Sequence, residues 1–109
     1  MPEFSSSQPK RVEFFTFNGH DYTTLEKVPK AIALQVLEEI RKVGYEAVLP
    51  VMFEKVLGEA DYQRFLTDVG QIEDENYDWI QAEIEAKVMG AVEGLGEGSR
   101  AGGKKSAGS

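Results

Sequence analysis

The chain has 109 residues and a formal net charge of −7, and it contains no cysteine. This length suits one domain, and a hydrophobic content of 41% is ordinary for a folded protein. The acidic balance argues against nucleic-acid binding and against attachment to an anionic membrane, because both surfaces are negatively charged. The lack of cysteine excludes disulfides, thiolate metal ligands and a cysteine nucleophile, and it is compatible with a reducing cytoplasm.

The first structured element is expected to be a β-hairpin. Residues 1–10 are polar, lack the pattern of a secretory signal and are expected to be disordered. The run Val12–Phe17 is rich in β-branched and aromatic residues, and Asn18-Gly19 follows it directly. Asn-Gly favours the tight type I′ turn, so His20–Thr24 is predicted to return as the second strand. Such a ribbon is marginal alone and must pack on the helices that follow.

Two helices are predicted next. From Lys30 the apolar residues recur every three or four positions, which predicts an amphipathic helix that Gly44 ends. Residues 45–57 predict a second helix, closed by Gly58. Pro50 lies inside this run, so it either kinks the helix or begins it after an irregular approach.

The remaining pattern predicts a short helix, a long helix and a glycine-rich tail. Asp61 is a plausible N-cap for the short helix. Asp74 or Asn76 can cap the long helix, which is expected to end at Gly94, with Trp79 beside its apolar stripe. That stripe consists of Tyr77, Ile80, Ile84, Val88 and Ala91. The predicted fold is therefore a small, mainly α domain of three to four helices with an N-terminal hairpin, spanning 11–93, and a flexible tail at 94–109.

No motif in the sequence indicates a metal or cofactor site. His20 is the only histidine, and one imidazole does not make a transition-metal site. A calcium-binding EF-hand pattern is matched at four positions, but the glycine that its sharp turn requires is replaced by Trp79. The four matching residues are Asp74, Asn76, Asp78 and Glu85. They are better explained as acids at the start of a helix, where negative charge is favourable.

Catalysis also lacks support in the sequence. No glycine-rich phosphate loop follows a strand, and no serine lies in a nucleophile elbow. No window approaches the ~18 apolar residues of a membrane span. We therefore expect a protein-binding domain that is not an enzyme, with no cofactor and with neither nucleic acid nor a membrane as its partner.

The order of the parts resembles a known family. An aromatic hairpin with an Asn-Gly turn (Phe14 to Tyr22) precedes a proline-bounded helix, the segment Val56–Tyr62 with its Leu-Gly-Glu sequence, a short helix, a long helix and a glycine-rich end. This arrangement, over residues 12–95, is similar to the tail assembly chaperones of long-tailed phages, especially those that infect actinobacteria.

The resemblance implies a definite role. Such chaperones bind the tape-measure protein in the host cytoplasm before the tail tube polymerises, keep it soluble and are absent from the finished virion. In many phages a −1 ribosomal frameshift makes a longer form thought to recruit the tube subunit. Gly103-Lys104-Lys105 could be encoded by a slippery stretch, which makes Gly103 and Lys104 the candidate frameshift site.

Client capture is expected to follow a helix-in-groove mode, in which apolar residues of the chaperone contact amphipathic client helices. The candidate contact residues are Leu34, Leu37, Val48, Leu49, Met52 and Phe53. Several copies per client, or a homo-oligomer, would be needed to cover a long chain. The alternative is a small acidic inhibitor or antitoxin-like regulator, whose acids at 73–85 would form one negative face for a basic partner.

Overall fold

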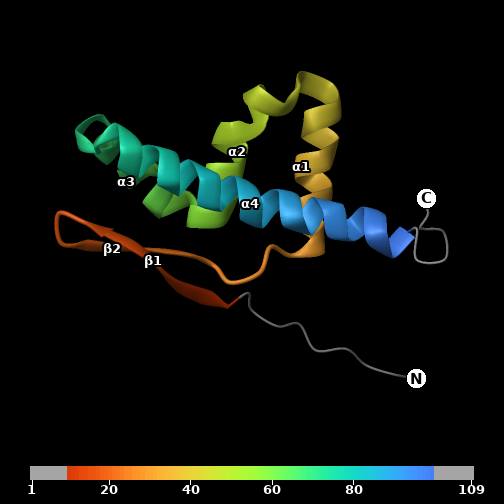
Figure 1. Cartoon of the computed structure of the whole chain (residues 1–109), viewed down its shortest axis with the longest axis horizontal. Coiled ribbons are helices and arrows are strands. Elements are labelled where there is room, and N and C mark those ends of the chain that lie inside the picture. Colours follow the sequence, from red (N-terminus) through yellow and green to blue (C-terminus); the bar gives the residue numbers. More distant parts are fainter. Residues whose placement is uncertain (1–9, 100–109) are drawn as a thin grey trace.

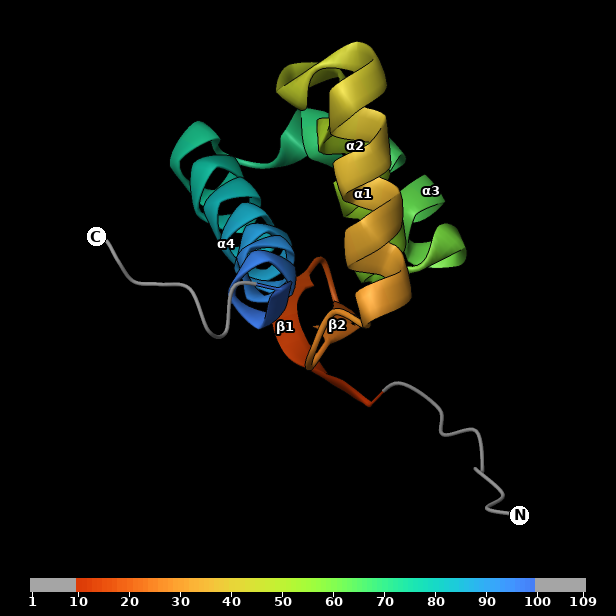
Figure 2. The same cartoon turned by 90° about the vertical axis from the view of Figure 1, so that its right-hand side faces the viewer.

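The computed structural model describes residues 10–99 as a mainly helical domain with an N-terminal β-hairpin, as the sequence predicts. In chain order the elements are β1 (Arg11–Phe17), β2 (His20–Leu25), α1 (Lys30–Val43), α2 (Tyr45–Leu57), α3 (Glu59–Asp68), a short 3-10 turn (Val69–Gln71) and α4 (Asp74–Ser99). The helices α1 and α2 form an antiparallel pair beside α4, and the hairpin lies beneath them (Figures 1 and 2). The candidate frameshift residues Gly103 and Lys104 lie outside the described residues.

The hairpin has the predicted turn and one irregularity. Asn18 and Gly19 both have positive φ angles, 49° and 81°, as a type I′ turn requires. The pairing of β1 with β2 shifts register between Glu13 and Phe15, so Phe14 is the extra residue of a β-bulge. Strand side chains alternate between two faces, and the bulge resets this alternation. Both Phe14 and Phe15 consequently pack against the helical core.

The helical boundaries follow the glycines. Gly44 and Gly58 have φ angles of 93° and 92°, and they separate α1 from α2 and α2 from α3. The second helix begins at Tyr45 and continues through Pro50, so the proline does not begin it. Proline has no backbone N–H, and the carbonyl of Glu46 therefore lacks its usual donor one turn later.

Two predicted boundaries are wrong. The third helix begins at Glu59 with Gly58 before it, so Asp61 is not the N-cap. Instead the Asp61 carboxylate lies 3.0 Å from Nε2 of His20, which links α3 to the hairpin. The fourth helix continues beyond Gly94 to Ser99. Each glycine costs only about 1 kcal/mol in a helix interior, so the glycines at positions 90, 94, 96 and 98 weaken α4 without ending it at Gly94.

The core lies where the hairpin and all four helices meet. The hairpin and each of the four helices contribute buried side chains to it. The predicted apolar stripe of α4 is part of this core, because Ile80, Ile84 and Val88 are each at most 2% exposed. The hairpin contributes Tyr22, which is fully buried and whose hydroxyl donates a hydrogen bond of 2.7 Å to Asp68. The marginal two-stranded ribbon is thus stabilised by its packing on α2, α3 and α4.

Candidate protein-binding grooves

The six residues predicted to contact a client do not share one surface. Val48, Met52 and Phe53 are at most 4% exposed and belong to the core. Val48 and Met52 are fully buried and are not available to a partner, whereas Phe53 also lines a groove. Leu34 is 55% exposed on α1, and Leu37 is half-buried on the same helix. Leu49 is half-buried on α2 and borders a groove that also includes the edge of Phe53.

That groove, which we call the Leu66 groove, lies between α2, α3 and the start of α4. It encloses about 190 Å³, and apolar and aromatic side chains dominate its lining. The lining residues are Leu49, Pro50, Phe53, Tyr62, Phe65, Leu66, Val69 and Tyr77. Phe53 forms its floor, with ring centroids 5.5 Å from Phe65 and 6.1 Å from Tyr77. Leu66 on the rim is 50% exposed, so apolar surface faces solvent here.

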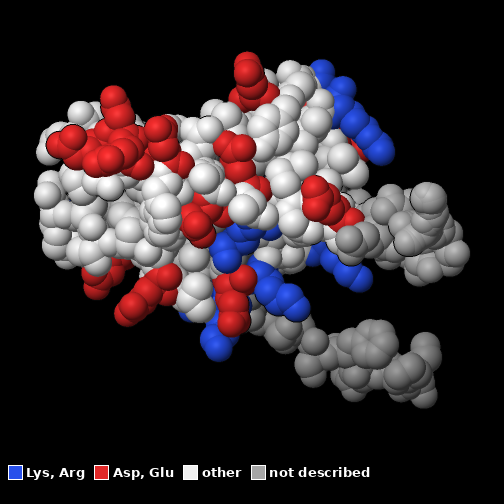
Figure 3. Space-filling model, viewed as in Figure 1, with Lys and Arg blue, Asp and Glu red and all other residues white. Residues whose placement is uncertain are grey.

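Exposed acidic residues lie near the Leu66 groove. Glu46 precedes Pro50 by one turn of α2, so its exposed carboxylate lies on the same side of the helix as a lining residue. Glu73 comes just before α4 and lines a separate polar depression with residues 70–75. More exposed acids follow at Asp74, Glu75 and Asp78 on the first turns of α4. Acidic side chains gather over this end of the molecule, where α3 meets α4 (Figure 3). A ligand of the groove would therefore meet apolar surface flanked by negative charge.

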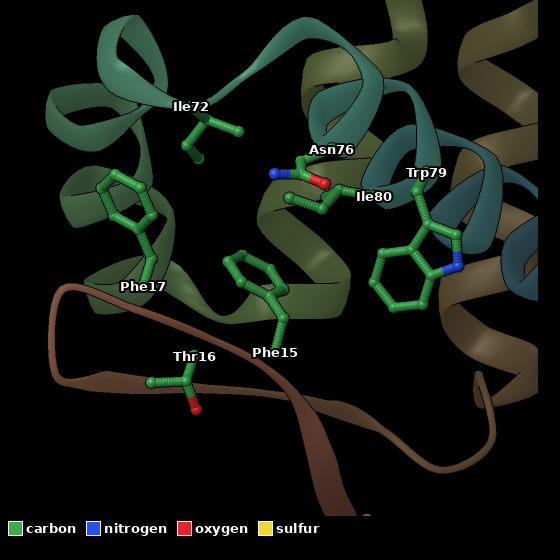
Figure 4. Close-up of a pocket in the computed structure, with 7 residues that line it drawn as sticks. All are labelled: Phe15, Thr16, Phe17, Ile72, Asn76, Trp79 and Ile80. Atoms are coloured by element: carbon green, nitrogen blue, oxygen red, sulfur yellow. The ribbon is translucent and has the colours of Figure 1, made fainter.

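A second groove, the Trp79 groove, lies between β1 and α4. Two depressions of about 270 and 250 Å³ flank the indole ring of Trp79, which is 49% exposed. The first is lined by Phe15, Thr16, Phe17, Ile72, Asn76, Trp79 and Ile80. In Figure 4 the side chains of Phe15 and Phe17 point from β1 toward α4, and Trp79 points back toward β1. The second depression includes Phe14, whose ring centroid lies 5.5 Å from that of Trp79.

Among residues 10–99, three tyrosines have a pKa that clearly departs from the ordinary value. Burial, a hydrogen bond to Asp68 and the charge of that carboxylate raise the pKa of Tyr22 well above its ordinary value. Burial and a hydrogen bond of 2.7 Å to Glu85 raise the pKa of Tyr45 to about 12. Burial and the nearby charges of Asp78 and Glu85 also raise the pKa of Tyr77. These hydroxyls are neutral at neutral pH, and those of Tyr22 and Tyr45 tie elements together as hydrogen-bond donors.

Within residues 10–99, no cluster of three or more His, Asp and Glu side chains is arranged to hold a metal ion. No helix in this part of the chain is both long and apolar enough to cross a membrane. Comparisons of the chain with models of known protein families, with curated proteins and with solved structures find no match. The two grooves are therefore interpreted from their own geometry.

Sequence reasoning missed the Trp79 groove and most of the Leu66 groove. The helix α2 carries apolar residues on nearly all of its faces, so its periodicity alone does not separate core from surface. Its core residue Met52 and its groove residue Leu49 consequently have the same sequence signal. A clue to the Trp79 groove was the position of Trp79 beside the apolar stripe of the long helix.

Proposed function

We propose that this chain is a tail assembly chaperone that binds amphipathic helices of the tape-measure protein of a long-tailed phage. The observation that carries the proposal is the Leu66 groove, an open apolar surface with acidic residues nearby in a chain of net charge −7. The tape-measure protein as client, and the host cytoplasm as the place of action, rest on the resemblance in the order of the chain's parts.

The groove suits the side chains of a helix better than a compact ligand. Its volume of about 190 Å³ accommodates one or two apolar side chains, so a client helix would lie across it and insert anchors on one face. Covering the exposed half of Leu66 contributes about 1 kcal/mol by area. Binding at one groove is therefore weak, and a long client would be held by several copies acting together.

The acidic residues near the groove and the net charge of the chain also fit an amphipathic client helix. The exposed carboxylate of Glu46 on α2, and the exposed acids at the start of α4, favour a client helix with lysine or arginine flanking its apolar face. The net charge of the chain then keeps the complex dispersed, because like-charged complexes repel one another. In this proposal a frameshifted longer form, beginning near Gly103 and Lys104, would add the domain that recruits the tube subunit.

The proposal is tested by co-expressing the full chain with the tape-measure protein encoded in the same genome and measuring the soluble fraction of that client. We expect the unmodified chain to keep the client soluble and Leu66→Lys to abolish most of this effect. Leu34→Lys is the matched control, because it changes the same residue type at 55% exposure on a different helix. Equal behaviour of the two variants, or no effect of the unmodified chain, would remove the proposal.

A second candidate function is an acidic inhibitor or antitoxin-like regulator. It is favoured by the exposed acids Glu73, Asp74, Glu75 and Asp78 at the end of the molecule where α4 begins (Figure 3). The predicted negative face does not extend to Glu85, which is half-buried and accepts hydrogen bonds from Tyr45 and Gln81. Salt separates the two functions: a basic partner held by charge is released as ionic strength rises, whereas a client held mainly by apolar contact loses much less affinity.

A further inference from the structure

We infer that the Trp79 groove is a second docking site, which takes an extended, basic segment of a partner protein as an additional strand beside β1. This site shares no lining residue with the Leu66 groove. The inference therefore does not depend on the proposed chaperone function, and each can fail without the other.

The backbone edge of β1 supports strand addition. Within the described residues, β1 pairs only with β2, and no backbone hydrogen bond joins its other edge to another element. The strand β2 packs on α2, so β1 lies on the opposite side of the hairpin, beneath α4 (Figure 2). The backbones of β1 and α4 do not pack closely, and the space between them contains side chains and the two depressions. An unpaired strand edge of this kind is a template for another strand.

The aromatic lining offers apolar surface to which an apolar residue of the incoming segment can anchor. The indole ring of Trp79 is half-exposed and separates the two depressions, and Phe14 packs against it because of the β-bulge. Side chains alternate along an added strand, so every second residue of the partner would point toward α4. An apolar residue at such a position would cover Trp79 and fill one depression.

The charged residues around the depression that contains Phe14 indicate which partner segment would bind there. Glu13 on β1 and Glu83 on α4 line the same depression, and neither carboxylate forms an ion pair with a described residue. Lys87 also lines this depression and donates a hydrogen bond to the carbonyl of Glu26, whereas the guanidinium of Arg11 donates to carbonyls at the end of α2. Two carboxylates and one ammonium leave the lining with a formal charge of −1, which favours lysine or arginine beside the apolar anchor. A second copy of this chain fits poorly, because each copy carries a net charge of −7.

The test is a titration of the full chain with a short peptide of alternating valine and lysine residues, followed through the fluorescence of Trp79, which is the only tryptophan. We expect a saturable change in emission. Replacing the lysines of the peptide by glutamate should weaken binding at least about tenfold, because the charges then repel. Methylating alternate backbone nitrogens of the peptide should abolish binding, because the added strand then loses its donors to β1. Equal binding of the lysine, glutamate and methylated peptides, or no binding of any of them, would overturn the inference.

Matched variants of the chain test whether the peptide binds at the Trp79 groove. Combined Glu13→Gln and Glu83→Gln changes should weaken binding of the lysine peptide about threefold to tenfold. The control pair Glu38→Gln and Glu59→Gln, two exposed carboxylates on α1 and α3, should leave the affinity unchanged. Leu66→Lys should also leave it unchanged, which separates this site from the client groove. If the control pair weakens binding as much as the groove pair, the peptide is held by overall charge and the inference is wrong.

Discussion

The guanidinium of Arg11, the first residue of the hairpin, donates a hydrogen bond of 2.8 Å to the carbonyl oxygen of Leu57, the last residue of α2. It also donates to the carbonyl of Val56 at 3.1 Å and to that of Thr23 at 3.0 Å. The last carbonyls of a helix have no intrahelical partner and carry partial negative charge. One side chain thus supplies donors to the end of α2 and connects it to both strands.

Replacing Arg11 by methionine should lower the free energy of unfolding by about 2–3 kcal/mol, because charged hydrogen bonds to part-buried carbonyls are lost while the side-chain stem is retained. Denaturant unfolding followed by circular dichroism measures the change. Lys10→Met is the control: this adjacent lysine is 73% exposed and lies 3.9 Å from Glu26, so its loss should change stability by less than about 0.5 kcal/mol. Similar losses in the two variants would show that Arg11 does not hold α2.

The raised pKa of Tyr45 predicts that the protein loses stability at alkaline pH. Its folded-state pKa of about 12 lies above the ordinary value of about 10, so its contribution is complete below about pH 10 and disappears as the pH rises through about 12. Tyr45→Phe should cost about 1 kcal/mol at neutral pH through the lost hydrogen bond to Glu85. Its stability should then fall less steeply than that of the unmodified chain above pH 10. Parallel alkaline declines in the two proteins would contradict this role for Tyr45.

Much of the fold follows from local sequence signals. The Asn18-Gly19 turn was predictable because only a few residue types adopt two consecutive positive φ angles. The glycines at positions 44 and 58 separate helices because they adopt positive φ angles that most other residues avoid. The β-bulge at Phe14 was not predictable, because consecutive aromatic residues fit either face of a strand until the helices are in place. The long-range contact from His20 to Asp61 likewise depends on the tertiary packing of α3 against the hairpin.

The candidate sites were less predictable than the fold. Leu34 and Leu66 are both leucines on amphipathic helices with about half of their surface exposed, yet of the two only Leu66 lines the groove between α2, α3 and α4. The difference arises from Pro50 and Tyr77, which reach the same place from α2 and α4. A surface made by three separate elements has no continuous sequence pattern. Sequence periodicity therefore indicated which helices carry apolar faces but not where those faces meet.

Replacing Pro50 by alanine should raise the stability of the fold but weaken binding of the client. Pro50→Ala restores an N–H donor for the carbonyl of Glu46 within α2 and should raise the free energy of unfolding by about 1–3 kcal/mol. It also removes part of the Leu66 groove lining, so retention of the client should fall. Pro29→Ala is the control, because this proline precedes α1, where no helical hydrogen bond is lost. That variant should gain no stability, and a gain equal to that of Pro50→Ala would refute the argument.

Trp79 and Ile84 lie on the same helix, and their truncation to alanine should lower the free energy of unfolding by very different amounts. Ile84 is 1% exposed, so Ile84→Ala should lower the free energy of unfolding by about 2–5 kcal/mol through lost burial and the cavity that remains. Trp79 is 49% exposed and contacts Phe14 at the surface, so Trp79→Ala should cost only about 1 kcal/mol. Thermal and denaturant unfolding of both variants measures the difference, with circular dichroism as the signal because Trp79→Ala removes the fluorophore. A large loss in Trp79→Ala would make the indole a structural support, and the Trp79 groove would then be a packing feature of the hairpin. A small loss leaves a large aromatic side chain half-exposed without a structural need, as expected of a residue that a partner covers.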